Sequence, residues 1–182
     1  LQQYFSVNRE EAKAIQQSFT TLQLKKGDHY LKAGRYSDLL GFIQSGILRE
    51  YSVNDGKETT KWISTKGYFA VDLSGFLFGS TARWNIQALT DCELHVISRQ
   101  AYEQIGESIP RWTALEKLFV AKCFMVLEDR ILQHLSMSAK QRYLQLFNSN
   151  SDLFNLVPLQ YLASMLGMTP ETLSRLRKKT SS

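Results

Sequence analysis

Glycine residues divide the first half of the chain into short runs of β-forming residues, and this spacing constrains the fold more than any other feature. The runs that we expect to be strands span residues 39–44, 47–53, 58–64, 86–89 and 94–98. Asp55 and Gly56, which separate two of these runs, are a strong hairpin signal. Closely spaced short strands with turn residues between them are typical of an antiparallel barrel or roll.

A helical pattern replaces this spacing after Arg99. Residues 112–135 contain no glycine or proline, and a heptad-like seam along them comprises Val120, Phe124, Leu127 and Ile131. Four more apolar residues lie largely on another side of this helix: Leu115, Leu118, Met125 and Leu132. A helix that is apolar on two sides needs two partners. We expect these to be the chain's own sheet and a second copy of the chain, and the alternative is a helix buried within one domain. Shorter helices are expected over residues 9–19, after a capping pattern that begins at Asn8, and over 138–147.

Composition and charge narrow the classes of protein. With 43% hydrophobic residues the chain can build a core and is not a disordered protein, and no stretch approaches the ~18 uninterrupted apolar residues of a membrane span. Residues 1–5 are too mixed for a signal peptide. The two isolated cysteines, Cys92 and Cys123, provide no disulfide framework, which fits a reducing cytoplasm.

From Met137 onward, six basic residues against two acidic ones supply +4 of the net charge of +5. This basic end suggests an anionic partner, and the alternative is a solvated lysine-rich terminus.

Residues 158–179 are the most informative segment, because they read as two short helices joined by a sharp turn. An apolar helical stripe comprises Leu159, Leu162, Ala163 and Leu166. Ala163 is small where a second helix must cross closely, and Gly167 can take the positive φ of the turn. Thr169, Pro170 and Glu171 then open a second helix with a cap, a proline in the first position and an acid in the first turn.

The second of these helices has one apolar side and one polar, basic side. Leu173 and Leu176 can face the first helix, while polar and basic residues point outward, where they can enter a DNA groove or reach phosphates. The residues that we expect to contact DNA are Thr169, Glu171, Thr172, Ser174, Arg175, Arg177, Lys178 and Lys179. The alternative is an ordinary helical hairpin with a charged exterior. The combination of turn, cap and basic second helix favours a helix-turn-helix that binds double-stranded DNA.

With these features, the sequence resembles the Crp/Fnr-type (cyclic-AMP receptor protein-like) bacterial transcription regulators along nearly its whole length. The roll carries the resemblance at residues 26–28, 33–34, 43–46, 55–57 and 66–69, and the terminal helices carry it at 167–175. The resemblance implies an α+β fold in three parts. These are a cyclic-nucleotide-binding-like antiparallel β-roll, or double-stranded jelly roll, over 1–109, a dimerisation helix over 110–136, and a winged-type helix-turn-helix over 137–182. The wing that usually follows the second helix is expected to be missing, since the sequence stops at Ser182.

The same resemblance implies a function. Members of the family are homodimers that pair through the long helix, bind a two-fold symmetric operator, contact RNA polymerase and are not enzymes. Glu171 and Arg175 correspond to the family's base readers, and Pro170 stands where the archetype has an arginine. This assignment agrees with direct chemistry, because arginine suits a guanine edge and glutamate accepts from cytosine N4. The sequence therefore predicts a cytoplasmic transcription regulator that responds to an effector.

The effector pocket is where the sequence departs from the family. In members that bind cyclic nucleotides, a glutamate holds the ribose and an Arg-Ser pair holds the cyclic phosphate. Here Asp72 stands at the glutamate position, Val71 replaces the preceding glycine, and Arg83 is displaced by one residue from the arginine position. We therefore expect an effector other than cyclic AMP. The composition of residues 75–80, with two glycines, predicts a mobile loop there. The expected pocket residues are Asp72, Leu73, Arg83 and Trp84.

Other sensing groups and other functions fit the sequence less well. Two isolated cysteines cannot hold an iron–sulfur cluster, and His29, His95 and His134 form no recognisable metal triad. One alternative function is a cyclic-nucleotide-binding regulatory module that acts without DNA, against which the terminal helices argue. A β-barrel metalloenzyme of the cupin kind would need clustered histidine and glutamate ligands on adjacent strands. Neither a Ser/His/Asp arrangement nor a phosphate loop is visible.

Overall fold

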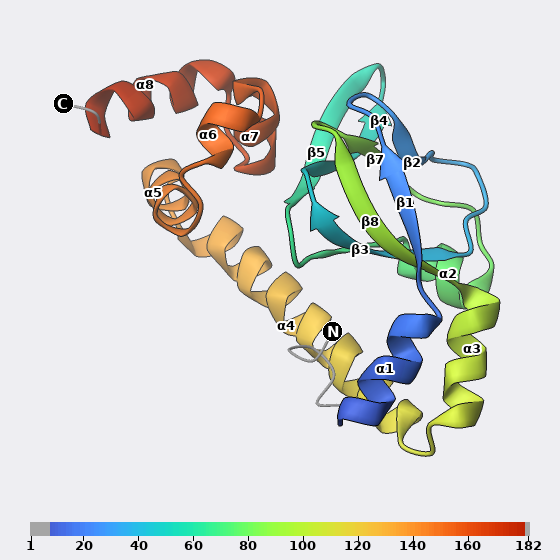
Figure 1. Ribbon diagram of the computed structural model, residues 1–182. Coiled ribbons are helices and arrows are strands. Elements are labelled where there is room, and N and C mark those ends of the chain that lie inside the picture. Colours follow the sequence, from blue (N-terminus) through green and yellow to red (C-terminus); the bar gives the residue numbers. More distant parts are fainter. Residues whose placement is uncertain (1–7, 181–182) are drawn as a thin grey trace.

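The computed structural model describes residues 8–180, in which a β-roll is joined through one long helix to a group of short C-terminal helices (Figure 1). Two antiparallel four-stranded sheets form the roll. The first sheet has the order β1 (Thr20–Leu24), β8 (Cys92–Ser98), β3 (Leu39–Ser45) and β6 (Phe69–Ala70). The second has the order β2 (His29–Leu31), β7 (Asn85–Ala88), β4 (Leu48–Asn54) and β5 (Lys57–Ser64). The predicted double-stranded jelly roll is confirmed.

The five predicted strands are all present, and the spacing of glycines misses the short strands β1, β2 and β6. The predicted hairpin joins β4 to β5, with φ of 50° at Asp55 and 74° at Gly56. This pair of strands contains one irregularity: Glu50 is opposite Trp62 and Tyr51 is opposite Thr60, so that Lys61 is an extra residue on β5. Such a bulge lets neighbouring side chains turn to the same side of a strand.

Helices close the base of the roll. The expected N-terminal helix is α1 (Arg9–Gln17), which has the predicted capping box between Asn8 and Glu11. It packs with α3 (Arg99–Ser108) and the start of the long helix around an aromatic cluster, in which the Tyr102 ring lies 5.2 Å from that of Trp112. The expected mobile loop over residues 75–80 is wrong. Most of it belongs to α2 (Leu73–Phe78), which is held because Phe76 is buried in the same cluster.

The long helix α4 (Trp112–Ser136) matches its prediction, but the roll covers much less of it than expected. Its buried residues are all in its first half: Trp112, Leu115 and Phe119. From its start near α1 the helix leads toward the C-terminal helices (Figure 1), and in its second half Arg130 stacks on Trp62 of the roll. Both predicted apolar sides are therefore open along most of its length. The exposed apolar residues are Leu118, Val120, Phe124, Met125, Val126, Leu127, Ile131, Leu132 and Leu135.

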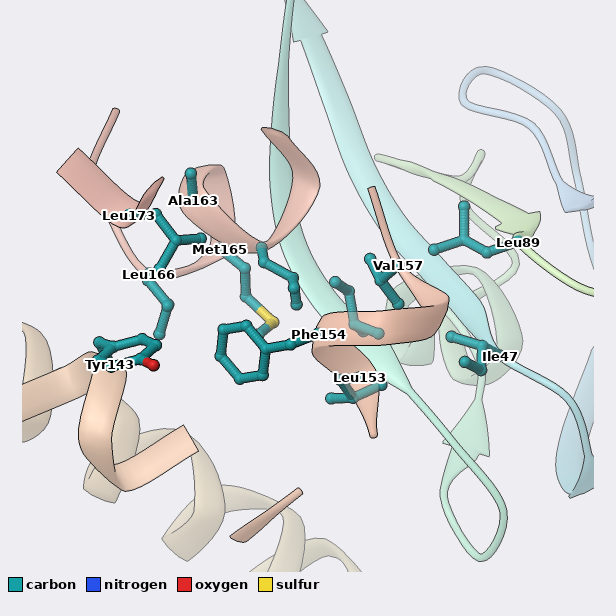
Figure 2. Close-up of a cluster of buried hydrophobic side chains, with 12 residues drawn as sticks. Ile47, Leu89, Tyr143, Leu153, Phe154, Val157, Ala163, Met165, Leu166 and Leu173 are labelled. Atoms are coloured by element: carbon teal, nitrogen blue, oxygen red, sulfur yellow. The ribbon is translucent and has the colours of Figure 1, made fainter. Parts of the chain in front are cut away.

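Four helices follow: α5 (Ala139–Ser149), α6 (Leu153–Leu156), α7 (Leu159–Met165) and α8 (Pro170–Thr180). α5 begins at a capping box formed by Ser138 and Gln141, and it extends two residues beyond the predicted end at residue 147. The core of these helices continues into the roll, because it also contains Ile47, Ile63 and Leu89. Figure 2 shows Ile47 and Leu89 beside Val157, and Phe154, Met165 and Tyr143 further from the roll. The C-terminal helices therefore pack directly against the outside of the sheet that contains β4 and β5.

Candidate nucleic-acid interface and sensor site

The turn between α7 and α8 has the geometry that the sequence predicts. Gly167 has φ of 65°, in the left-handed region that glycine adopts without strain. The backbone N–H of Met168 donates to the carbonyl of Ala163 over 3.0 Å, which closes the end of α7. Ala163 and Leu173 are both fully buried where the two helices cross. The small side chain of Ala163 lets the two helices approach closely, and Leu173 fills the space between them.

The first turn of α8 is capped by its own side chains. The hydroxyl of Thr169 accepts a hydrogen bond from the backbone N–H of Thr172 over 3.3 Å, as an N-cap does. Glu171 is exposed in this turn. The pKa of the Glu171 carboxyl is below its ordinary value, mainly because the carboxylate accepts a hydrogen bond from a backbone N–H. The carboxylate is therefore ionised and can act as a hydrogen-bond acceptor at the surface.

One face of α8 presents polar side chains to the outside. A shallow groove along this face is lined by Leu159, Pro170, Glu171, Ser174, Arg175, Lys178 and Lys179. Five of the eight residues predicted to contact DNA therefore share one surface, and Thr169 is exposed just before it. Arg177 differs, because its guanidinium lies 5.9 Å from the ring centre of Phe154, on the side of α8 that faces the core. Thr172 is half-buried and takes part in the cap.

The sequence does not predict how the first helix of this unit meets the roll. Arg49 on β4 is only 1% exposed, although its neighbour Leu48 points into the roll core and Arg49 points outward. Its guanidinium lies between two aromatic rings, 4.3 Å from the centre of Tyr51 and 3.6 Å from the centre of Tyr161 on α7. Glu58 and Thr60 accept hydrogen bonds from it over 2.6 and 2.9 Å. Arg49 thus joins the β4–β5 hairpin to α7.

Two further contacts support this junction. The backbone N–H of Thr60 on β5 donates to the hydroxyl of Ser164 on α7 over 2.9 Å. Arg130 of α4 stacks 4.4 Å from the ring centre of Trp62 and donates to the carbonyl of Met165 over 3.0 Å. The hairpin, α7 and α4 are therefore linked to one another. No local pattern signals these contacts, because each joins residues far apart in the sequence.

Asp72 has a structural role in the sensor site. Its carboxylate is 4% exposed, caps the start of α2 by accepting from the N–H of Ser74 over 3.1 Å, and accepts from the N–H of Arg83 over 2.7 Å. Leu73 is the first residue of the same helix. Both carboxylate oxygens are thus engaged with the backbone. A carboxylate buried in this way is not exposed to a ribose hydroxyl.

The other predicted pocket residues contact one another. The Arg83 side chain is 57% exposed, and its guanidinium lies 4.1 Å from the ring centre of Trp84. The ammonium of Lys61, the bulged residue of β5, lies 3.7 Å from the same ring and forms a 2.8 Å ion pair with the nearly buried Glu50. The structure thus brings all four predicted residues close together, beside the Glu50–Lys61 ion pair.

The cysteines and histidines lie apart. Burial is the main factor that raises the pKa of both thiols, Cys92 in the roll and Cys123 on α4, and neither forms a disulfide. Within residues 8–180, no three side chains of the metal-binding types come close enough together to hold an ion. In the same range, no helix combines the length and apolar character that crossing a membrane requires.

Comparison with known proteins gives the following matches. Residues 21–108 match the cyclic nucleotide-binding domain family. The structure is similar to FixK2 from Bradyrhizobium japonicum, with a TM-score of 0.73, 16% identity, and coverage of 88% of this chain and 83% of that chain. It is also similar to CLP of Xanthomonas campestris, a c-di-GMP responsive global regulator, with a TM-score of 0.72, 17% identity and coverage of 96% and 92%. For the catabolite activator protein of Thermus thermophilus the TM-score is 0.61, with 18% identity and coverage of 96% and 84%. No curated protein sequence matches the chain.

At these identities the similar structures establish the fold, and they cover the roll, the long helix and the terminal helices together. This fold is the one implied by the resemblance at the glycine turns of the roll and at residues 167–175. Residues 21–108 therefore match the cyclic nucleotide-binding domain family, and the chain as a whole shares the fold of these regulators.

Proposed function

We propose that this protein is a sequence-specific DNA-binding transcription regulator that works as a homodimer. The observation that carries the proposal is the exposed polar face of α8, which presents Glu171, Ser174, Arg175 and Lys178 on a helix anchored by the buried Leu173. A capped helix held by a first, crossing helix is the arrangement by which helix-turn-helix proteins enter the major groove. The basic charge that gathers after Met137 gives this end of the molecule attraction for phosphates.

The residues of this face divide into two roles. Arg175 can donate two parallel hydrogen bonds to a guanine edge, and Glu171 can accept from a cytosine amine. Lys178 and Lys179, on the following turn, suit contacts with backbone phosphates, which position the helix without reading sequence. Arg177 supports the helix from its inner side, where it lies near Phe154. Base reading is therefore assigned to Arg175 and Glu171.

Dimerisation follows from the exposed apolar residues of α4. Phe124 is 58% exposed and Ile131 is 50% exposed, and with Val120 and Leu127 they form the predicted seam. A contiguous apolar surface of this kind on a soluble protein marks an interface. Pairing two copies of α4 buries it and relates two α8 helices by a two-fold axis. The operator is then two-fold symmetric, with half-site centres about 34 Å apart. A dimer bound to its operator would then contact RNA polymerase.

The roll is the part that senses, and its effector is not cyclic AMP in the usual mode. Support comes from the Asp72 carboxylate, which is engaged with the backbone, and from the Glu50–Lys61 ion pair. We assign the sensor to residues 1–109, the dimerisation helix to 110–136 and the DNA-binding part to 137–182. The two free cysteines suit a protein that acts in the reducing cytoplasm.

The test starts from random-sequence DNA, since the operator has to be found. Rounds of selection with the full chain are expected to enrich a two-fold symmetric consensus. Fluorescence anisotropy with the selected duplex then compares three variants. Arg175→Ala should cost ~1–3 kcal/mol and relax preference at one base pair, and Lys178→Ala should weaken all duplexes alike. Arg35→Ala, which removes the same charge from an exposed position on the roll, is the control.

Two results would contradict the proposal. One is an Arg175→Ala variant with unchanged affinity and unchanged base preference. The other is a wild-type chain that enriches no sequence and binds no duplex even at low salt, where phosphate contacts are strongest. The second result would favour the alternative, a regulatory module that acts without DNA.

A further inference from the structure

A cavity of about 480 Å³ lies where the roll, the long helix and the DNA-binding helices meet. Its volume is within the range of small-molecule sites in proteins. β5 and the segment after it supply Trp62 and Tyr68, α4 supplies Asp129 and Arg130, and α5 supplies Arg142, among others. Met165 and Leu166, at the end of α7, complete the wall. A molecule in this cavity would touch all three parts of the chain at once.

The cavity borders the dimer seam on one side of α4. On a helix with 100° between residues, Asp129 and Gln133 fall on the opposite side of α4 from Phe124 and Ile131, whereas Arg130 and His134 lie on the flank next to the seam. Dimerisation through the seam therefore leaves Asp129 and Gln133 uncovered. None of the four predicted sensor residues lines the cavity.

Two arginines in the wall have hydrogen-bond donors to spare. Arg130 donates through Nη2 to the carbonyl of Met165, and Arg142 donates through Nε to Leu166 over 2.9 Å and through Nη1 to Met137 over 2.6 Å. A guanidinium carries five N–H donors. No hydrogen bond among residues 8–180 uses the Nη2 amine of Arg142 or the Nη1 amine of Arg130. These groups keep their positive charge at any physiological pH, and one acidic residue, Asp129, shares the wall with them.

The rest of the wall is aromatic and apolar. The rings of Trp62 and Tyr68 are 6.3 Å apart and inclined at 53°, so they form an open corner. The Tyr68 side chain is 42% exposed, which leaves part of its ring available. Apolar side chains continue from this corner: Ile63, Val126, Leu146, Leu153, Met165 and Leu166. An apolar wall with a few placed polar groups is typical of sites for small organic ligands.

We propose that this cavity is an effector site for a small planar aromatic molecule that carries a carboxylate or a phosphate. The ring packs against Trp62 and Tyr68, and the anionic group binds the spare N–H donors of Arg130 and Arg142. Both arginines also hold the carbonyls at the end of α7, so an anion that draws on them alters the support of the DNA-binding helices. This regulatory consequence rests on the proposed DNA-binding function, whereas the binding of the ligand does not.

The experiment uses the full chain and three probes that share one ring system. 1-Naphthaleneacetate and 1-naphthyl phosphate carry the two candidate anionic groups, and 1-naphthaleneacetamide is the neutral match. Calorimetry and protein-observed NMR should give one site per chain, with at least one anion bound roughly tenfold tighter than the amide, which corresponds to one charged hydrogen-bonded contact. Binding of the acetate or of the phosphate alone would support the proposal and identify the group.

Two nearly isosteric variants test the site in opposite directions. Asp129→Asn removes the acidic group from the wall and should tighten the anions roughly fivefold, while Gln145→Glu adds one and should weaken them roughly fivefold. Both positions are exposed, so neither change threatens the fold. Gln141→Glu, on the same helix but outside the cavity, adds the same charge at a capping position that accepts glutamate, and should leave affinity unchanged.

Equal affinity for the anions and the amide, or equal anion affinity in the wild type and in both cavity variants, would overturn the site. The selected duplex is then titrated with and without the tighter anion, and a shift in DNA affinity is expected. A chain that binds the anion but no DNA would refute the proposed function and leave the site standing. A chain that binds DNA but no anion would refute the effector site and leave the proposed DNA-binding function standing.

Discussion

The guanidinium of Arg49 on β4 lies 3.6 Å from the ring centre of Tyr161 on α7, and the arginine is 1% exposed. This pair joins a strand of the β-roll to the first helix of the proposed DNA-binding part. A buried arginine needs partners for its charge, and here Glu58, Thr60 and two rings supply them. The orientation of α7, and with it α8, therefore depends on the conformation of the β4–β5 hairpin.

Replacing Arg49 with alanine should lower the free energy of unfolding by about 3 kcal/mol, because packing, hydrogen bonds and cation–π contacts are lost together. Tyr161→Leu keeps most of the buried volume and should cost about 1 kcal/mol. Urea unfolding of the two single variants and the double variant measures their coupling, which we expect to be about 1 kcal/mol.

Arg35→Ala is the control for this series, since Arg35 is exposed on the roll, and its effect should stay within about 0.5 kcal/mol. If the effects of Arg49→Ala and Tyr161→Leu simply add, the two side chains are not coupled and the junction is held by other contacts.

The apolar seam on α4 leads to a second prediction, which concerns dimerisation. Phe124→Glu places a charge in the middle of the proposed interface and should raise the dissociation constant of the dimer roughly thirtyfold or more, as losses at interface centres do. Sedimentation velocity over a range of concentrations measures this change, and circular dichroism should show an unchanged helix content. Tyr36→Glu makes the same kind of change at a roll residue that is 77% exposed, and it should leave the dimer intact. A wild-type chain that sediments as a monomer at every concentration would contradict the seam.

The two backbone hydrogen bonds that the Asp72 carboxylate accepts predict how its substitution changes stability. Asp72→Ala removes the cap of α2 and the acceptor for the Arg83 N–H, and should lower the free energy of unfolding by about 1–2 kcal/mol. Asp152→Ala is a matched control, because Asp152 precedes α6 without a side-chain capping bond. Calorimetric titration of the wild type with cyclic AMP and cyclic GMP should give no saturable heat. One-site binding of either nucleotide that Asp72→Ala abolishes would instead place the ligand in the sensor cluster.

A fourth prediction concerns acid stability. The Arg111 guanidinium, which bonds both oxygens of Glu11 over 2.8 and 2.6 Å, is the main cause that lowers the pKa of this carboxyl below its ordinary value. Because the folded state favours the ionised form, its contribution is present above the ordinary carboxylate pKa and is lost as the pH falls through the lowered value. The difference in unfolding free energy between wild type and Glu11→Gln should therefore shrink on acidification.

Urea titrations between neutral pH and the acid range measure this difference. Glu10→Gln serves as the control, since Glu10 is exposed on the same turn of α1. A Glu11→Gln difference that stays constant across the acid range would show that the ion pair does not link the start of α4 to α1 energetically.

Much of the fold follows from local patterns in the sequence. The Asp55-Gly56 turn, the caps at Asn8 and Ser138 and the left-handed Gly167 each depend on residues a few positions apart, so their chemistry is visible without the tertiary structure. The exposed face around Arg175 is predicted for the same reason, since helical spacing alone separates it from the buried Leu173.

Only the tertiary structure decides which apolar and charged side chains meet across the parts of the chain. The sequence predicts that the roll covers one side of α4, yet Met125 and Leu132 are exposed. The roll buries Leu115 and Phe119 near the start of that helix, and farther along it contacts Arg130 through Trp62. Arg49 is buried against a helix that lies more than 100 residues later in the chain, and the two arginines at the cavity bond carbonyls 35 and 24 residues away. Local spacing carries no information about such contacts, because burial is a property of where the whole chain places its surfaces.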